Sequence, residues 1–177
     1  SDYDIYRDGL KIYTTIDSRM QLHAEEAVSA HMANLQQEFF IQAKNNKNAP
    51  FVNISTAETN RILNRAMKSS NRWNVLKSLD KTEEEIIKSF SVKTKMTVFT
   101  WKGEKDTIMT PIDSIRYYKH FLQSGLMAME PQTGNIKAWV GGINYKYFQY
   151  DHVGQGARQV GSTFKPFVYA TAIEQLN

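Results

Sequence analysis

The sequence predicts an α+β fold in which helices pack against a partial antiparallel sheet. Alternation of apolar residues, typical of strands with one buried face, occurs at residues 10–16, 125–130 and 135–140. Segments with apolar residues at helical spacing lie between and after these strands. With 177 residues, of which 41% are hydrophobic, the chain can bury a core, and disorder is not expected.

Composition excludes several function classes. The 22 Lys and Arg residues are spread among 18 Asp and Glu residues, and the net charge of +4 is not gathered into the basic stripe of a nucleic-acid-binding protein. No window approaches the roughly 20 apolar residues of a membrane span, so we expect a soluble segment. Cysteine is absent and the four histidines are not at metal-ligand spacing. We therefore predict neither a metal nor an organic cofactor, and no nucleic-acid partner.

The first region, residues 1–40, is predicted to be a strand followed at once by a helix. The strand covers residues 10–16. Asp17 or Ser18 can cap the helix, and Gln21 stands three residues after Ser18, as in a capping box. We expect the helix to end near Phe40. Its apolar stripe comprises Met20, Ala24, Ala27, Val28, His31 and Leu35.

The second region, residues 41–107, is predicted to be a helical insertion or small subdomain. A polar run at residues 44–50 ends in proline and marks its boundary. Helices are expected at residues 55–69 and from Thr82, because each begins with a Ser or Thr followed three residues later by Glu. A strand at residues 95–101 leads into a turn.

The third region, residues 108–177, holds the clearest hairpin. A helix is expected to begin at Pro111. The strands at residues 125–130 and 135–140 are joined by Pro-Gln-Thr-Gly, a sequence suited to a tight turn. An irregular loop follows, and a largely buried helix is predicted at residues 162–176. Four aromatic residues of the loop either line a substrate groove or pack over the sheet, two readings of equal weight: Tyr145, Tyr147, Phe148 and Tyr150.

Ser162 and Lys165 are the candidate catalytic residues. Positions three apart on a helix lie on one face, so the Lys165 amine can approach the Ser162 hydroxyl. A lysine desolvated by apolar neighbours has a lowered pKa and can take the proton of a serine nucleophile. A serine at a helix N-terminus also has free backbone N–H groups nearby for an oxyanion.

The Ser-x-x-Lys spacing alone is not specific. Ser78 and Lys81 have the same spacing in a polar setting, where a solvated turn is expected. A lone match is more often a serine cap and a surface lysine than a catalytic pair. A non-catalytic partner-binding module therefore stays open as an alternative.

The hairpin and the stretch "RQVGSTFKPFVYATAIEQ" together resemble the class A, high-molecular-mass penicillin-binding transpeptidases of peptidoglycan synthesis. The similarity is strong over residues 124–177 and moderate over residues 9–30. It implies a truncated penicillin-binding transpeptidase fold, which is like that of the serine β-lactamases. It also implies that Ser162 attacks the D-Ala-D-Ala bond of stem peptides and is acylated by β-lactams, with Lys165 as its base.

The sequence departs from the family pattern in places. Val160 stands where many relatives have Pro, and residues 150–153 replace a more usual Asn-Arg-Ala. The family's Ser-x-Asn and Lys-Thr-Gly motifs are expected downstream of residue 177, and no Lys-Thr-Gly or Lys-Ser-Gly occurs in these 177 residues. We therefore expect an N-terminal part of the transpeptidase domain that is inactive by itself, with an uncovered sheet edge through which chains could pair.

The resemblance also implies where the parent protein works. The family places it outside the cytoplasmic membrane, anchored through a segment not present in this sequence and carrying a glycosyltransferase domain. A β-lactamase or D,D-carboxypeptidase, which passes the acyl group to water, is the alternative within the same chemistry.

Overall fold

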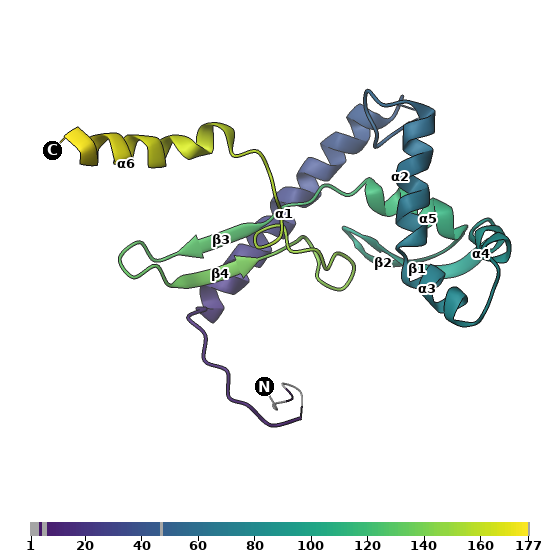
Figure 1. Cartoon of the computed structure of the whole chain (residues 1–177), viewed down its shortest axis with the longest axis horizontal. Coiled ribbons are helices and arrows are strands. Elements are labelled where there is room, and N and C mark those ends of the chain that lie inside the picture. Colours follow the sequence, from purple (N-terminus) through teal and green to yellow (C-terminus); the bar gives the residue numbers. More distant parts are fainter. Residues whose placement is uncertain (1–3, 5–6, 47, 177) are drawn as a thin grey trace.

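The computed structural model describes residue 4, residues 7–46 and residues 48–176. It is an α+β structure with two separate two-stranded antiparallel sheets and packed helices (Figure 1), as the sequence predicted at this level. The elements in chain order are α1 (Ser18–Ala43), α2 (Thr56–Lys68), α3 (Asn71–Ser78), α4 (Glu83–Phe90), β1 (Thr94–Thr100), β2 (Gly103–Met109), α5 (Pro111–Lys119), β3 (Leu126–Met129), β4 (Ile136–Val140), the 3₁₀ turn η1 (Gly161–Phe164) and α6 (Lys165–Leu176).

Helix α1 packs against strand β4 of the β3–β4 hairpin. Its N-cap is Asp17, whose carboxylate accepts the backbone N–H groups of Arg19 and Met20. The Ser18 capping box predicted from the sequence is not formed, because Gln21 points to β4 instead. The buried residues of α1 recur every four positions and are Ala24, Val28, Met32 and Gln36.

The β3–β4 hairpin confirms the clearest prediction from the sequence. Leu126 pairs with Val140 and Ala128 with Ala138, with an irregularity just after Ala128. Gly134 in the turn has φ 73°, a left-handed conformation that favours glycine. The first core cluster forms where the hairpin, α1 and part of the middle region meet, and its buried members are Ala24, Val28, Met32, Phe99, Phe121, Ala138, Val140 and Ile143.

The middle region has a second core cluster, made by α2, α3 and α4 together with the start of α5. Buried Met67, Trp73, Ile86 and Phe90 form it. Helices α2, α4 and α5 confirm the predictions for these segments, whereas α3 and β2 were not predicted. Each of the four helices α2 to α5 begins with a hydroxyl side chain that accepts a backbone N–H, from Ser55, Ser70, Thr82 and Thr110 respectively.

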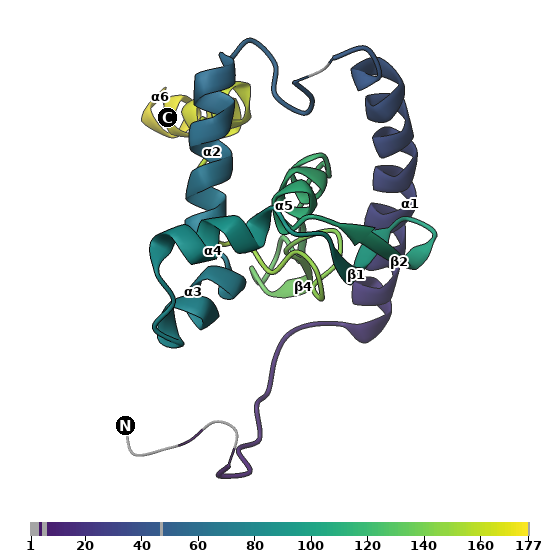
Figure 2. The ribbon, with the colours of Figure 1, turned by 90° about the vertical axis from the view of Figure 1, so that its right-hand side faces the viewer.

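Strand β1 and helix α5 connect the two clusters. Phe99 of β1 lies in the first cluster, and its backbone accepts a hydrogen bond from the Tyr117 hydroxyl at 2.6 Å. Ile112 and Ile115, which precede Tyr117 on α5, pack on the second cluster. Figure 2 shows β1, β2 and α5 between α1 on one side and α2 on the other.

Two predictions from the sequence are wrong. Residues 10–16 do not form a strand, and the side chains of Ile12 and Tyr13 are exposed. Only the end of this segment contacts β4. There the Thr15 hydroxyl donates to the Ile136 carbonyl at 2.7 Å, and the backbone N–H of Asp17 donates to the Lys137 carbonyl at 2.9 Å. A strand needs a partner along its length, and among the described residues the segment has one only at this end.

The second error concerns the last helix. It forms as expected, but every residue from 157 to 175 is exposed, and α6 extends away from the rest of the chain (Figure 1). A helix is buried only where another element covers its apolar face, and none of the described elements covers α6. Within the described ranges, no helix has both the length and the apolar content that a membrane span requires.

Candidate functional site

Ser162 and Lys165 lie at the junction of η1 and α6. Gly161 opens this turn with φ 51°, a left-handed conformation that a glycine adopts without steric cost. The backbone N–H of Lys165 donates to the Ser162 carbonyl, so the two residues are joined by one turn of 3₁₀ helix. The structure thus places the predicted pair on consecutive turns at the start of a helix.

The apolar surroundings predicted for Lys165 are not formed among the described residues. The Phe164 and Phe167 rings lie 5.6 Å apart but are 51% and 66% exposed. No hydrogen bond joins the Ser162 and Lys165 side chains in the part of the chain that the structure describes. The prediction of a desolvated lysine is wrong for this chain alone, because nothing described here covers α6.

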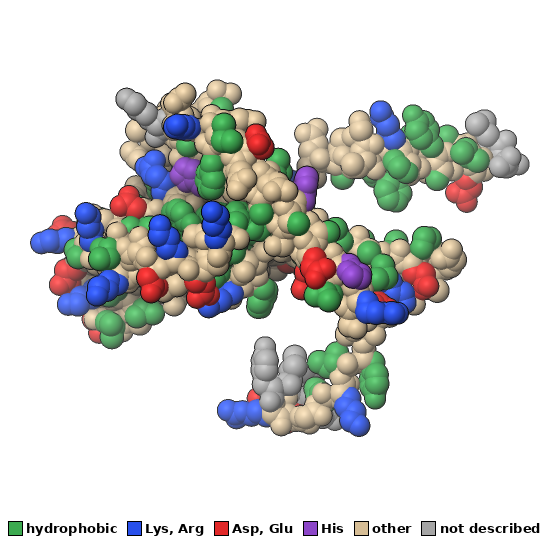
Figure 3. Space-filling model, turned by 180° about the vertical axis from the view of Figure 1, so that it is seen from behind, with side chains coloured by type: hydrophobic (Ala, Val, Ile, Leu, Met, Phe, Trp, Pro, Cys, Tyr) green, Lys and Arg blue, Asp and Glu red, His purple; other side chains and the backbone are tan. Residues whose placement is uncertain are grey.

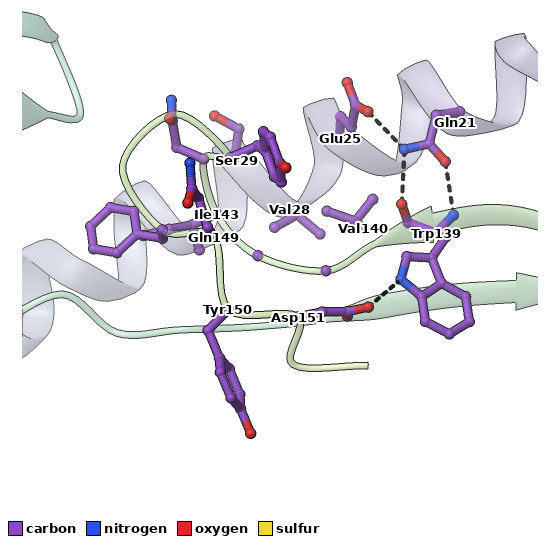
Figure 4. A pocket seen from close by; sticks show the side chains of 15 residues that line it. Gln21, Glu25, Val28, Ser29, Trp139, Val140, Ile143, Gln149, Tyr150 and Asp151 are labelled. Carbon is purple, nitrogen blue, oxygen red and sulfur yellow. Dashed lines mark hydrogen bonds between the residues drawn. The ribbon is translucent and has the colours of Figure 1, made fainter. Parts of the chain in front are cut away.

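A pocket of about 520 Å³ lies upstream, where α1, the end of β4 and the loop after β4 meet (Figure 4). Val28, Val140 and Ile143 give it an apolar floor, and amides, tyrosines and two carboxylates form its polar parts. Two hydrogen-bonded side chains, Gln21 and Asp151, fix its walls. The sequence had suggested a capping box for Gln21 and no role for Asp151.

Gln21 joins α1 to β4 as a neighbouring strand would. Its side-chain oxygen accepts the Trp139 backbone N–H at 2.8 Å, and its side-chain nitrogen donates to the Trp139 carbonyl at 3.0 Å (Figure 4). The same nitrogen donates to Glu25 at 2.7 Å. The amide therefore satisfies both backbone groups of one β4 residue.

Asp151 organises the loop after β4. One of its carboxylate oxygens accepts the indole N–H of Trp139 at 3.1 Å (Figure 4). The other accepts the backbone N–H groups of Val153 and Gly154 at 2.9 and 3.1 Å. The Gly154 N–H, followed by the Val153 N–H and the indole, lowers the pKa of Asp151 below its ordinary value.

The four loop aromatics divide between the two readings that the sequence left open. Tyr147 and Phe148 pack on the first core cluster, each against the ring of Phe99. Tyr145 is 81% exposed and Tyr150 is half exposed, and both line the pocket, as Phe148 also does. The loop therefore both covers the core and supplies aromatic side chains to the pocket rim.

The charged side chains give no further site. Figure 3 shows Lys and Arg interspersed with Asp and Glu on the face that it displays, without a patch of one sign. Among the described residues, no group of three or more His, Cys, Asp and Glu side chains is arranged to hold a metal ion.

Comparison with known proteins finds similarity to penicillin-binding proteins. The family model of the penicillin-binding protein middle domain matches residues 46–122, which span α2 to α5. The penicillin-binding protein 1A of Neisseria flavescens is 26% identical over 96% of this chain, and that of Rickettsia prowazekii is 25% identical over 98%. The chain is therefore similar to penicillin-binding proteins 1A over nearly its whole length. Over a shorter stretch of 52 residues, 29% of the chain, it is 40% identical to the penicillin-binding protein 1A of Pseudomonas aeruginosa.

The chain spans about a quarter of the length of the relatives that it matches throughout, since it covers 24% of both the Neisseria flavescens and the Rickettsia prowazekii proteins. No solved structure gives a significant match.

Proposed function

We propose that the complete protein is a serine D,D-transpeptidase that crosslinks peptidoglycan, with Ser162 as nucleophile and Lys165 as base. The observation that carries the proposal is the position of this pair. In this chain, which is similar to penicillin-binding proteins 1A, a serine and a lysine three residues apart lie at the first turn of a helix, after a left-handed glycine. Ser78 and Lys81 lack this setting, because Ser78 is the last residue of α3 and its hydroxyl donates to the Val75 carbonyl.

The chemistry follows from the two side chains. Neutral Lys165 takes the Ser162 hydroxyl proton as the serine oxygen attacks the carbonyl of the penultimate D-Ala of a stem peptide. The bond to the terminal D-Ala breaks, this residue leaves with a proton, and an ester to Ser162 remains. An amine of a neighbouring stem peptide then attacks the ester, forming the crosslink and restoring the serine. These steps need no metal or organic cofactor.

A β-lactam carries a strained amide in place of the peptide bond. Attack by Ser162 opens the ring, and the acyl group stays on the serine because no leaving group departs. We therefore propose stem peptides as substrates and β-lactams as inhibitors at the same oxygen.

The exposure of α6 affects whether Lys165 can act as a base in the 177-residue chain. A lysine in water is protonated, so Lys165 can act as a base only when its surroundings are desolvated. Since the chain spans about a quarter of its relatives' length, we propose that the rest of the complete protein covers α6 and supplies the Ser-x-Asn and Lys-Thr-Gly motifs. The 177 residues alone are then expected to be inactive, and β3 could pair with another chain through its uncovered edge.

The family also supports a place for the reaction. We propose that the protein works outside the cytoplasmic membrane, where peptidoglycan is assembled, and that it is anchored through a segment beyond these 177 residues. Within the chain, we propose residues 1–40 and 108–177 as parts of the transpeptidase domain and residues 41–107 as a small subdomain inserted between them.

Two alternatives make different predictions. A β-lactamase or D,D-carboxypeptidase forms the same acyl-enzyme but passes the acyl group to water, so it releases D-Ala without forming crosslinks. A non-catalytic partner-binding module does neither, and in it Ser162 only begins a helix.

The test is a crosslinking assay on the complete protein with peptidoglycan precursors, in which crosslinked products and free D-Ala are measured together. We expect crosslinks from the wild type and none from Ser162→Ala or Lys165→Ala, while Ser78→Ala, the control at the second Ser-x-x-Lys, stays active. Release of D-Ala without crosslinks would favour a hydrolase, and full activity of a folded Ser162→Ala protein would remove Ser162 from the chemistry.

A further inference from the structure

The segment between β4 and Ser162 is folded tightly as far as Gly156. The His152 N–H donates to the Gly141 carbonyl at 2.7 Å, which returns the loop to the end of β4. The Gln155 N–H donates to the Asp151 carbonyl at 2.9 Å, and the Tyr150 hydroxyl to the Gln155 carbonyl at 2.7 Å. From residue 157 to residue 175 the chain is exposed throughout, so this loop is the last anchored part of the described chain before Ser162.

Asp151 is the centre of this anchor. Its two carboxylate oxygens accept three N–H groups, one from the Trp139 indole on β4 and two from the loop itself, at Val153 and Gly154. Hydrogen bonds to an ionised carboxylate are stronger than those between neutral groups. The carboxylate therefore ties the direction in which the loop leaves the sheet to the position of one β4 side chain.

The fit around Asp151 leaves no room for larger residues. A Cβ atom added at Gly141 would lie 2.8 Å from one Asp151 oxygen, and one added at Gly154 would lie 2.9 Å from the other. Glycine at both positions lets the carboxylate lie directly against the backbone. The loop and the strand end are thus packed closely enough to fix one arrangement.

The backbone of Trp139 is hydrogen-bonded to helix α1. Gln21 binds both the N–H and the carbonyl of Trp139, so a continuous series of hydrogen bonds runs from Gln21 through Trp139 to Asp151 (Figure 4). The series joins helix α1 to the loop that leads to Ser162, although Gln21 lies 118 positions before Trp139 in the sequence.

We propose that Trp139 and Asp151 are positioning residues for the nucleophile: their indole–carboxylate hydrogen bond fixes the loop that leads to Ser162 and so sets where Ser162 and Lys165 stand in the assembled site. The inference rests on the function proposed above. Neither residue touches the reacting atoms. Their contribution is to the geometry of acylation, which is sensitive to displacements of about 1 Å.

The test measures acylation of the complete protein by benzylpenicillin under pre-steady-state conditions, which separates the dissociation constant of the initial complex from the acylation rate constant. Trp139→Phe keeps an aromatic ring but removes the indole N–H. Asp151→Asn keeps an oxygen for Val153 and Gly154 but places an amide N–H₂ against the indole N–H, so two donors face each other.

The matched control is Trp101→Phe. Trp101 also packs on the first core cluster, but its buried indole N–H has no hydrogen-bond partner among the described residues. Its replacement therefore removes an indole N–H of the same kind without breaking a hydrogen bond.

We expect Trp139→Phe and Asp151→Asn each to lower the acylation rate constant by roughly ten-fold to a hundred-fold, the order of effect that a misplaced reacting group produces. The dissociation constant and the melting temperature should stay close to those of the wild type, and Trp101→Phe should acylate normally. The double variant should be acylated no more slowly than the slower single variant, because both substitutions break the same hydrogen bond, the one between the Trp139 indole and the Asp151 carboxylate.

The possible outcomes separate the two proposals. Wild-type acylation with unchanged rate constants in both variants would overturn the positioning role alone, and so would effects that multiply in the double variant. Equal losses in Trp101→Phe would also overturn it, since the loss would then follow from core packing. A folded wild-type protein that is not acylated at all would overturn both this inference and the proposed function.

Discussion

Gln36 connects α1 to the middle region by the same kind of contact that Gln21 makes with β4. Its side chain is fully buried, donates to the His120 carbonyl at 2.9 Å and accepts the Leu122 N–H at 2.8 Å. Each glutamine thus serves as a backbone-like partner for a segment about 80 or more positions away in the sequence. Together they set α1 against both the hairpin and the end of α5.

Replacing the buried Gln36 by an apolar residue is expected to lower the free energy of unfolding. Gln36→Leu would leave the His120 carbonyl and the Leu122 N–H without their partner, and an unsatisfied buried group costs about 1–3 kcal/mol. We expect the free energy of unfolding to fall by about 2 to 4 kcal/mol on this basis, measured by urea denaturation. Gln37→Leu is the control, since Gln37 is exposed. Equal stability of the two variants would contradict this role of Gln36.

Sequence reasoning proposed Ser162 and Lys165 as the catalytic pair, which stays a prediction, and it missed Gln21 and Gln36 as connecting residues. The partners of both glutamines are backbone groups of distant segments, which no local pattern reveals. A signal was present for Gln36, because it continues the buried series Ala24, Val28 and Met32 at four-residue spacing. A polar residue in the middle of an apolar stripe predicts a buried hydrogen bond.

At the scale of elements, prediction succeeded where local chemistry decides the structure. The β3–β4 hairpin and helices α2, α4 and α5 carry their own signals in turn residues, capping side chains and apolar spacing. Helix α3 has only eight residues and one buried side chain, Trp73, so its periodicity is weak. Strand β2 is rich in charges and forms because β1 offers it a full ladder of partners. The strand predicted at residues 10–16 does not form because, among the described residues, no strand pairs with this segment along its length.

The start of α1 gives a pH-dependent test. The backbone N–H groups of Met20 and Arg19 hold the pKa of Asp17 below its ordinary value. The cap therefore adds stability above the unfolded pKa of about 3.9, and this contribution disappears as the pH falls through the lower pKa of the folded state. Asp17→Asn keeps a capping oxygen but does not titrate.

We expect the wild type to lose stability relative to Asp17→Asn when the pH is lowered from neutral to about 2, well below the ordinary carboxyl range. The measurement is the difference in free energy of unfolding between the two proteins at each pH, in which the effects of the other carboxylates cancel. A difference that does not change with pH would mean that the ionised cap contributes nothing.

At the scale of the whole molecule, two core clusters share α5, and α6 belongs to neither. Phe99 is the centre of the first cluster, where its ring lies within 6 Å of those of Trp101, Phe121, Tyr147 and Phe148. The sequence predicted α6 as a buried helix from its apolar composition, which is correct only where something covers it. Composition alone does not say whether the covering element lies within a given stretch of sequence.

Because Phe99 is buried and Phe167 is exposed, replacing each by alanine should change the free energy of unfolding by very different amounts. In the 177-residue chain, Phe99→Ala should lower the free energy of unfolding by about 3–5 kcal/mol, the cost of removing a buried Phe ring. Phe167→Ala should change it by less than about 0.5 kcal/mol, because the side chain is exposed. In the complete protein, where α6 is proposed to be covered, Phe167→Ala should become destabilising. Thermal or urea unfolding of both chains checks this, and a neutral Phe167→Ala in the complete protein would argue that α6 stays uncovered.

The central claim is that Ser162 is the nucleophile. The most direct measurement is the intact mass of the complete protein after incubation with excess benzylpenicillin, beside Ser162→Ala, Ser78→Ala and the 177-residue chain. We expect one covalent adduct per molecule on the wild type and on Ser78→Ala, and none on Ser162→Ala or on the isolated 177-residue chain. An adduct that persists in Ser162→Ala, or a folded complete protein that takes up no benzylpenicillin, would contradict it.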